Sequence, residues 1–264
     1  MSHRLTLVDV RGMKSRGERV VCLTAYDASL ARLVEAAGAE LVLVGDSLGM
    51  VVQGHDTTLP VTLDEVIYHT RCVARGLSRA MLIADLPFMS YATPEQAMHS
   101  AARLMKEGGA QVVKLEGGAS RLETVAALSR QGIPVCAHLG LTPQSVHKLG
   151  GYRVQGREPK AAQAMLEDAM ALERAGADLL ILECIPSPLA EKITRALRIP
   201  VIGIGAGPAC DGQVLVSYDL LGLTARPPRF VKNYAATHGA PDKALKAFVD
   251  EVKSGAFPQP EHCF

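Results

Sequence analysis

The chain has 264 residues, of which 48% are hydrophobic and 21% are charged, as expected of a globular protein with an ample core. Its 28 basic and 27 acidic residues leave a formal net charge of +1, which gives no electrostatic attraction for nucleic acid or for an anionic membrane. We find no apolar run of the roughly 18 residues that a membrane-spanning helix needs.

Aliphatic runs alternate with helical patterns along the chain. Apolar runs without alternation are typical of parallel strands that are covered on both faces. Thr62 with Glu65, and Thr93 with Gln96, are expected to form capping boxes that open two helices. Amphipathic helices are expected at 160–176, 187–198 and 242–255. The eight expected strands are 20–26, 41–46, 80–85, 112–116, 133–140, 179–184, 199–205 and 213–219.

This alternation predicts an α/β fold, a (β/α)₈ TIM barrel. We expect a single domain over residues 1–264, with an N-terminal helical cap and a C-terminal helix and tail. A doubly wound sheet is the alternative, but its glycine fingerprint belongs after the first strand, whereas GIGAG (203–207) lies at the seventh. GIGAG could bind phosphate or simply make a tight connection. The next segment, up to the eighth strand, is too short for a full helix.

Four of the aliphatic runs end in an acidic residue. Because ligands bind at the carboxyl ends of parallel strands, we expect these four side chains to converge on one site. Three of the strands also follow the same small-residue turn, so the phrase repeats about every two βα units. The acids are Asp46, Asp85, Glu116 and Glu183, and the turns contain Gly38, Gly109 and Gly176.

Asp46 and Asp85 are candidate ligands of Mg²⁺, which proteins usually hold through one or two carboxylates. Either residue could instead cap a turn, but two such acids on adjacent strands favour the metal. Zinc is less favoured because the sequence has no Cys/His ligand spacing. The six cysteines are scattered without a CxxC pair, and the first residues lack a secretory pattern, so we expect a reduced, cytoplasmic setting.

Lys114 and Glu116 are two residues apart on one expected strand and therefore point to the same face. They could form a buried ion pair, or Lys114 could bind a substrate carboxylate or form a Schiff base. Glu183 follows an apolar run, which suits a general base, although a structural ion pair is also possible. His138 is expected to act as an orienting donor. The long Gly-rich segment 139–157 is predicted to be a lid.

Six long segments resemble the ketopantoate hydroxymethyltransferase family, and together they run from about residue 5 to 235. The segments are LTAYDASLARLVEAAGAELVLVGDSLGMVVQGHDTTLPVTLDEV, ADLPFMSY, VKLEGG, HLGLTPQSVHKLGGYRVQGR, LECIP and IGIGAGPACDGQVLV. The resemblance implies a barrel of the phosphoenolpyruvate/pyruvate type. It also implies transfer of a hydroxymethyl group from 5,10-methylenetetrahydrofolate to 3-methyl-2-oxobutanoate, which gives 2-dehydropantoate in pantothenate biosynthesis.

The same resemblance implies roles for individual residues. It places the Mg²⁺ ligands on Asp46 and Asp85, with Glu116 as a third acid of the metal site. It places oxoacid binding on Asp46, Ser47, Asp85 and Lys114, beside His138. Glu183 would be the proton acceptor, and the metal would stabilise the resulting enolate. The family forms homo-oligomers, commonly decamers, so the same is expected of this chain.

Three other functions are compatible with these residues. One is another metal-dependent lyase or aldolase that acts on a 2-oxoacid through an enolate. Another is a Schiff-base aldolase that uses Lys114. The last is a barrel that has lost catalysis and only binds or scaffolds, which is disfavoured because a dead site is expected to lose at least one of four costly strand-end acids.

Overall fold

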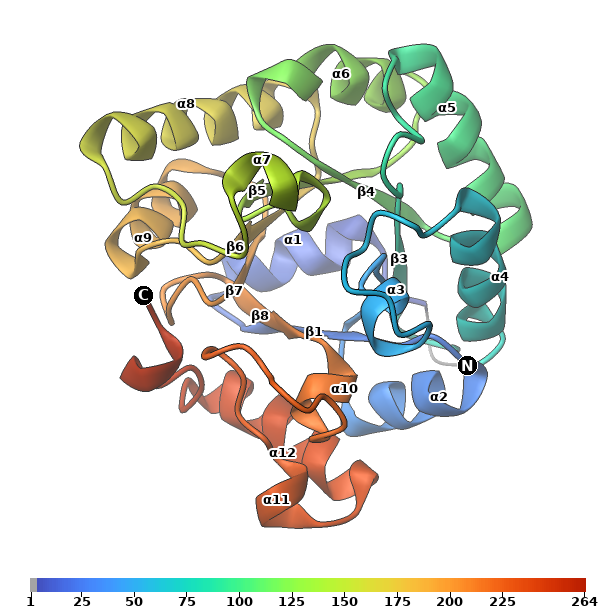
Figure 1. The fold of residues 1–264 in the computed structure, drawn as a ribbon, viewed down its shortest axis with the longest axis vertical. Helices are drawn as coiled ribbons and strands as arrows, with labels where there is room; N and C mark the ends of the chain where they lie inside the picture. Colours follow the sequence, from blue (N-terminus) through green and yellow to red (C-terminus); the bar gives the residue numbers. More distant parts are fainter. Residues whose placement is uncertain (1–3) are drawn as a thin grey trace.

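The computed structural model describes residues 4–264 and contains a closed barrel of eight parallel strands (Figure 1). The strands follow one another in chain order, and β8 pairs with β1 to close the barrel, with Val20 opposite Gly212. The predicted (β/α)₈ barrel is therefore confirmed, and the doubly wound sheet is wrong. The strands are β1 (Val20–Thr24), β2 (Leu41–Val44), β3 (Met81–Asp85), β4 (Val112–Glu116), β5 (Val135–Gly140), β6 (Leu179–Glu183), β7 (Val201–Ile204) and β8 (Gly212–Leu215).

The longer helices form a ring around these strands (Figure 1). They are α2 (Ala28–Ala37), α4 (Leu63–Ala74), α5 (Pro94–Arg103), α6 (Leu122–Arg130), α8 (Pro159–Ala175), α9 (Ser187–Ala196) and α12 (Pro241–Ser254), and a π-helical turn η1 (Leu104–Gly108) extends α5. The shorter helices are α3 (Leu48–Val51), η2 (Ala119–Arg121), η3 (Pro143–Ser145), α7 (Val146–Leu149), α10 (Ser217–Leu220), α11 (Ala235–His238) and η4 (Pro260–His262). Residues 205–211, between β7 and β8, form turns, as the sequence predicts.

Two helix starts were expected to carry capping boxes, and one of them does. The Thr62 hydroxyl accepts from the backbone N–H of Glu65, whose carboxylate accepts from the N–H of Thr62. The Thr93 hydroxyl likewise accepts from the N–H of Gln96. The Gln96 side chain, however, accepts from the N–H of Ala92 at 2.9 Å. The prediction of a reciprocal box at Thr93 is therefore wrong, because Gln96 reaches one residue further back.

The repeated turn has a simple structural cause. Gly38, Gly109 and Gly176 all adopt the left-handed conformation, with φ of 106°, 84° and 106°. Each of them ends the helical segment that precedes an even-numbered strand, β2, β4 or β6. Glycine is favoured there because a side chain is strained at positive φ. The repeat is thus a feature of barrel architecture.

The eighth strand is shorter than expected. β8 ends at Leu215, and Ser217, Tyr218 and Asp219 belong to the short helix α10. The chain turns there because the backbone N–H of Ser217 donates to the Thr24 hydroxyl at 3.0 Å, and the Ser217 hydroxyl donates to the Thr24 carbonyl at 2.5 Å. The expectation of strand up to residue 219 is therefore wrong. The first strand also ends early, at Thr24.

Helix α1 (Leu7–Ser15) contacts the amino end of the barrel. Lys14 reaches the starts of two strands, since its Nζ donates to the carbonyl oxygen of Ile199 at 2.9 Å and lies 2.8 Å from Asp211 Oδ2. Arg11 pairs with Asp178, which directly precedes β6. These contacts tie α1 to the end of the barrel opposite the strand-end acids. Among residues 4–264, the structure has no helix with the length and apolarity needed to span a bilayer.

The strands are buried along nearly their whole length, as their unbroken aliphatic runs predict. Every residue of β1, β2, β3, β4, β7 and β8 is buried. Two of those buried residues are Lys114 and Glu116 in β4. Burying charged groups is costly unless they are paired, so their surroundings decide what they can do.

Candidate active site

The strand register brings the predicted site residues together at the carboxyl end of the barrel. Asp85 at the end of β3 lies opposite Lys114 in β4, and Glu116 lies opposite His138 in β5. Glu183 ends β6, one strand further round. All seven residues predicted from the sequence line one cavity: Asp46, Ser47, Asp85, Lys114, Glu116, His138 and Glu183.

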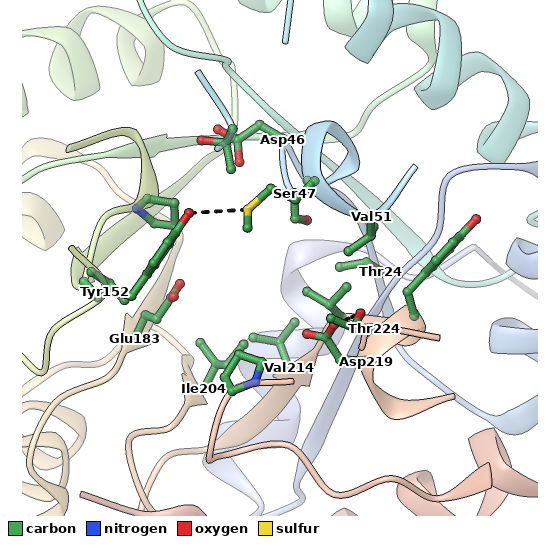
Figure 2. Close-up of a pocket in the computed structure, with 18 of the residues that line it drawn as sticks. Thr24, Asp46, Ser47, Val51, Tyr152, Glu183, Ile204, Val214, Asp219 and Thr224 are labelled. Carbon is green, nitrogen blue, oxygen red and sulfur yellow. Dashed lines mark hydrogen bonds between the residues drawn. The ribbon is translucent and has the colours of Figure 1, made fainter. Parts of the chain in front are cut away.

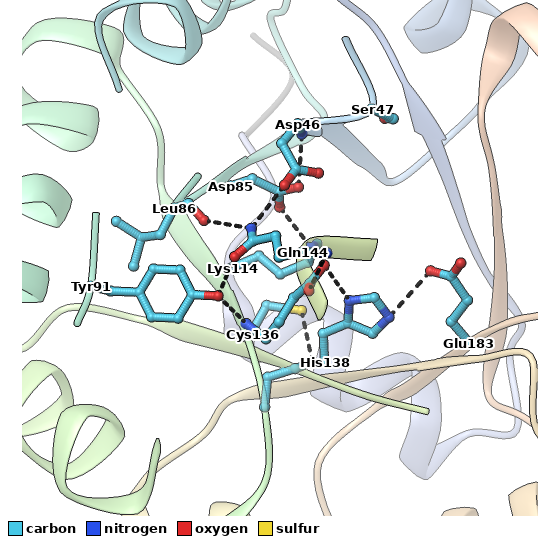
Figure 3. Close-up of polar contacts among 12 residues, drawn as sticks. Asp46, Ser47, Asp85, Leu86, Tyr91, Lys114, Cys136, His138, Gln144 and Glu183 are labelled. Carbon is cyan, nitrogen blue, oxygen red and sulfur yellow. Dashed lines mark hydrogen bonds and ion pairs between the residues drawn. The ribbon is translucent and has the colours of Figure 1, made fainter. Parts of the chain in front are cut away.

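Asp46, Asp85 and Lys114 form a buried polar group (Figure 3). The backbone N–H of Asp46 donates to Asp85 Oδ2 at 2.9 Å, and Lys114 Nζ lies 2.9 Å from Asp85 Oδ1. Burial lowers the pKa of Lys114, but the carboxylates of Asp85, Glu116 and Asp46 outweigh it and raise that pKa well above its usual value. Lys114 is therefore a fixed ammonium ion, which suits a substrate carboxylate better than Schiff-base chemistry.

Asp46 is buried among other acids, and the positive charge nearby only partly offsets the cost of ionising it. Burial, and then the carboxylates of Asp85 and Glu116, raise the pKa of Asp46 well above its usual value. Lys114 and Gln144 lower the pKa of Asp46, but their effect is smaller than that of burial and the two acids. Carboxylate oxygens are the ligands that a hard divalent cation prefers, and one or two carboxylates usually hold Mg²⁺. Asp46 and Asp85 therefore fit such a cation.

Glu116 occupies a different position from the two aspartates. One of its oxygens, Oε2, accepts from the backbone N–H of Gln144 at 3.0 Å, and the other, Oε1, lies 3.5 Å from His138 Nδ1. Within residues 4–264, no three His, Cys, Asp or Glu side chains are arranged as one metal-ligand group. Two carboxylates are nevertheless enough for Mg²⁺ when water and substrate oxygens complete its coordination.

His138 lies between the two glutamates (Figure 3). Its Nε2 is 3.2 Å from Glu183 Oε2, on the side away from Glu116. Burial and Lys114 lower the pKa of His138, but Glu116 and Glu183 more than compensate and raise it to about 9. With that pKa the imidazole is positively charged at neutral pH, and it lies at ion-pair distance from the Glu183 carboxylate at the rim of the cavity.

Sequence reasoning missed Gln144 and Tyr91, which connect these acids. The Gln144 amide donates to Asp46 Oδ2 at 2.8 Å and to the Leu86 carbonyl at 3.0 Å, and it accepts from the Tyr91 hydroxyl. Gln144 lies in η3, inside the segment that was predicted to be a lid. Neither residue ends an apolar strand. The available signal for Gln144 was its place within a segment already singled out for its length.

The cavity has a volume of about 1160 Å³ and opens at the carboxyl end of the barrel (Figure 2). The predicted lid segment contributes Leu141, Pro143 and Tyr152 to its wall. The Tyr152 hydroxyl contacts Met50 Sδ at 3.4 Å, so this segment reaches helix α3, which follows β2. Ser47 is held by the Tyr26 hydroxyl at 2.8 Å. Of the segment GIGAG (203–207), only Ile204 lines the cavity.

Comparison with known proteins agrees with this geometry. The model of the family described as ketopantoate hydroxymethyltransferase matches residues 4–260. The chain belongs to this family. A 3-methyl-2-oxobutanoate hydroxymethyltransferase of Halorhodospira halophila is 59% identical over 260 residues, which cover 98% of this chain and 94% of the relative. The enzyme of that name from Methylococcus capsulatus is 58% identical over 264 residues, covering 100% of this chain and 98% of the relative.

Solved structures outside the family share its fold. Phosphonopyruvate hydrolase in complex with oxalate and Mg²⁺ has a TM-score of 0.63 at 13% identity and covers 98% of this chain and 93% of that one. Phosphoenolpyruvate phosphomutase from Streptomyces platensis has a TM-score of 0.63 at 16% identity and covers 97% of this chain and 100% of that one. At such identities the likeness concerns the fold alone, a closed barrel of parallel strands.

Proposed function

We propose that this protein transfers a hydroxymethyl group from 5,10-methylenetetrahydrofolate to 3-methyl-2-oxobutanoate and so produces 2-dehydropantoate for pantothenate biosynthesis. The family match supports the reaction. The observation in the site that carries it is the placement of Lys114 and two aspartates on one side of His138, with Glu183 on the other. This arrangement suits an oxoacid whose carboxylate and keto groups are bound beside Lys114 and the aspartates, while its C3 atom faces Glu183.

We assign the metal to Asp46 and Asp85, with Glu116 as a third acid that supports the site through Gln144 and His138. Mg²⁺ bound there would supply Lewis-acid polarisation of the oxoacid carbonyl. Asp46 is buried beside Asp85 and Glu116, and a bound cation would offset the cost of ionising it. We propose that this cation is Mg²⁺ rather than another hard divalent ion.

The residues around the metal site have separate roles in the proposed reaction. Lys114 offsets the charge of the substrate carboxylate, and Ser47 donates a hydrogen bond to the bound oxoacid. Glu183 removes the proton from C3, and His138 holds one of its oxygens so that the other faces the substrate. The carbanionic C3 then attacks the one-carbon unit of the folate. One water molecule supplies the hydroxyl oxygen of the product, and the bonds from this carbon to the folate nitrogens break to release tetrahydrofolate. Segment 139–157 excludes bulk water from the carbanion.

Deuterium exchange at C3 of 3-methyl-2-oxobutanoate tests this function. We expect exchange with Mg²⁺ and no folate, formation of 2-dehydropantoate only when methylenetetrahydrofolate is added, and loss of both with EDTA. Product without folate would instead indicate the lyase or aldolase alternative. Borohydride trapping of the oxoacid on the protein in the presence of EDTA would indicate a Schiff base at Lys114.

We also infer that the protein acts in the cytoplasm as a homo-oligomer, and the family resemblance favours a decamer. All six cysteines are free thiols, which is compatible with a reducing compartment. The oligomer follows from the family resemblance alone. Light scattering of the purified protein tests it, and a monomer at micromolar concentration would contradict it.

A further inference from the structure

A further buried acid lines the cavity, on the side away from the metal site. Asp219 belongs to α10, and it lies across the cavity from Asp46 (Figure 2). Only 6% of the residue is exposed. Its Oδ1 accepts from the Thr224 hydroxyl, and within residues 4–264 it forms no ion pair. Such a carboxylate is costly to bury, and the chemistry proposed above makes no use of it.

The cavity is also much larger than the oxoacid. Its volume of about 1160 Å³ is in the range of pockets that hold ligands of drug size or more. Val51 and Val214 form apolar walls near Asp219 (Figure 2), and Arg226 and Arg229 also line the cavity. An apolar slot with one buried carboxylate matches a flat aromatic ring that carries hydrogen-bond donors on one edge.

The pterin ring of a folate has such an edge. Its 2-amino group and its N3–H are adjacent donors that point the same way, like the fork of a guanidinium group. A carboxylate can accept both in a bidentate pair, and such pairs are stronger than ordinary hydrogen bonds. Because each carboxylate oxygen has two acceptor sites, the Thr224 hydroxyl can remain bound to Oδ1 while Asp219 accepts from the ring.

We propose that Asp219 anchors the pterin ring of the folate co-substrate, with Thr224 holding the carboxylate in place. This assignment rests on the proposed function, and it deepens it by giving the folate a subsite. The ring would lie between the apolar walls on the β8 side of the cavity, and the one-carbon unit would face the oxoacid site. Asp219 is therefore a binding residue, separate from Glu183 and from the metal acids.

The first experiment measures tetrahydrofolate binding by calorimetry for the wild type, Asp219→Asn and Asp219→Ala. Asp219→Asn keeps the shape of the side chain and can still accept a hydrogen bond from Thr224. Its amide NH2 group, however, is a donor and cannot accept from the N–H donors of the pterin ring. We expect Kd to rise by about 30-fold or more in both variants. Asp242→Asn, which changes an exposed acid in the first turn of α12, is the control. Folate-free C3 exchange reports whether the barrel and the oxoacid site remain intact.

A modified ligand separates ring recognition from a purely structural role of Asp219. A tetrahydrofolate with a methyl group in place of the 2-amino group should bind the wild type about 30-fold more weakly than tetrahydrofolate does. Asp219→Ala should discriminate between the two ligands by less than about 3-fold, because the acceptor is gone. If the variant discriminates as strongly as the wild type, the assignment is overturned.

The two proposals can fail separately. Product formation by the wild type, together with unchanged tetrahydrofolate binding in Asp219→Asn, would overturn the subsite and leave the hydroxymethyl transfer in place. A wild type that exchanges the C3 proton but gives no product with methylenetetrahydrofolate would overturn the transfer itself.

Discussion

At the scale of single residues, the site depends on how Lys114 is surrounded. It is buried, paired with Asp85 at 2.9 Å, and close enough to the other acids to keep its charge. The same lysine therefore stabilises the folded site and supplies positive charge for a substrate carboxylate. Removal of one partner of a buried ion pair leaves an uncompensated charge, which costs far more than the loss of an exposed pair.

Lys114→Met should consequently lower the free energy of unfolding by about 3 kcal/mol and weaken oxoacid binding. Urea denaturation and calorimetric titration with 3-methyl-2-oxobutanoate measure the two effects. Lys160→Met, at an exposed position in α8, is the matched control and should change neither. Oxoacid binding of normal strength in Lys114→Met would contradict the assigned role.

Glu183→Gln should lower the rate of C3 deuterium exchange at least about 100-fold while oxoacid binding is retained. The amide keeps the shape of the side chain but cannot accept the proton. Exchange followed by NMR, with binding measured separately, distinguishes this result from loss of the site. Normal exchange in the variant would show that another group is the base.

At the scale of elements, the end of β5 positions the end of β6. Gly140 has φ of 98°, and a Cβ there would lie 2.1 Å from the carbonyl oxygen of Glu183. That carbonyl also accepts from the N–H of Leu141 at 2.8 Å. Backbone contact at this point therefore sets the position of the proposed base.

Gly140→Ala should reduce C3 exchange by more than about 10-fold and lower the free energy of unfolding by about 2 kcal/mol. Gly132→Ala is a suitable control, because Gly132 also has positive φ (74°) but open space around its Cβ position. The control should show the backbone strain alone, with activity preserved. Equal losses of activity in the two variants would argue against a specific contact with Glu183.

Helix α2 is joined to the start of β3 through Glu35. Its carboxylate accepts from the backbone N–H groups of Ser78, Arg79 and Ala80 at 3.0, 2.7 and 2.7 Å. Burial raises the pKa of Glu35, but these hydrogen bonds and the Ser78 hydroxyl outweigh it and hold the pKa below its usual value. Because the folded state favours the ionised form, the resulting stability is fully present above the unfolded pKa of about 4.3 and is lost as pH falls through the lower, folded pKa.

Glu35→Gln should therefore lower the free energy of unfolding by about 1–2 kcal/mol at pH 7 and by less near pH 3. Urea denaturation at a series of pH values measures the difference. Glu123→Gln, in the first turn of α6, serves as the comparison. A difference between Glu35→Gln and wild type that stays constant down to pH 3 would contradict this account.

At the scale of the whole molecule, the buried acids make the barrel sensitive to ligands at its carboxyl end. Addition of Mg²⁺ with the oxoacid at about 100 times Kd should stabilise the protein by about 2.7 kcal/mol and raise Tm by about 5–10 °C. EDTA should reverse the shift. Asp46→Asn should abolish the part of the Tm increase that depends on Mg²⁺. A Tm that rises in this variant as much as in the wild type would place the cation elsewhere.

Prediction from sequence succeeded where a residue type carries a strong local cost. Asp46, Asp85, Glu116 and Glu183 stood out because an acid at the end of a buried strand needs a reason. Asp219 was the last residue of an expected strand, 213–219, but it was not singled out, because Ser217 and Tyr218 separate it from the aliphatic run. Gln144 is an amide in a loop, and its contacts with Asp46 and Glu116 join residues that are 98 and 28 positions away in the chain.

The sequence by itself determined the barrel and the rim of acids. Periodic aliphatic strands, glycine-ended helices and strand-end carboxylates are local features, and parallel strands bring their ends to one face whatever the details of packing. Only the tertiary structure decided which acids share a neighbour. The register of β3 to β6 pairs Lys114 with Asp85 and places His138 beside Glu116 and within reach of Glu183, and the turn after β8 brings Asp219 into the same cavity. Those relations depend on distances across the barrel, which no local pattern encodes.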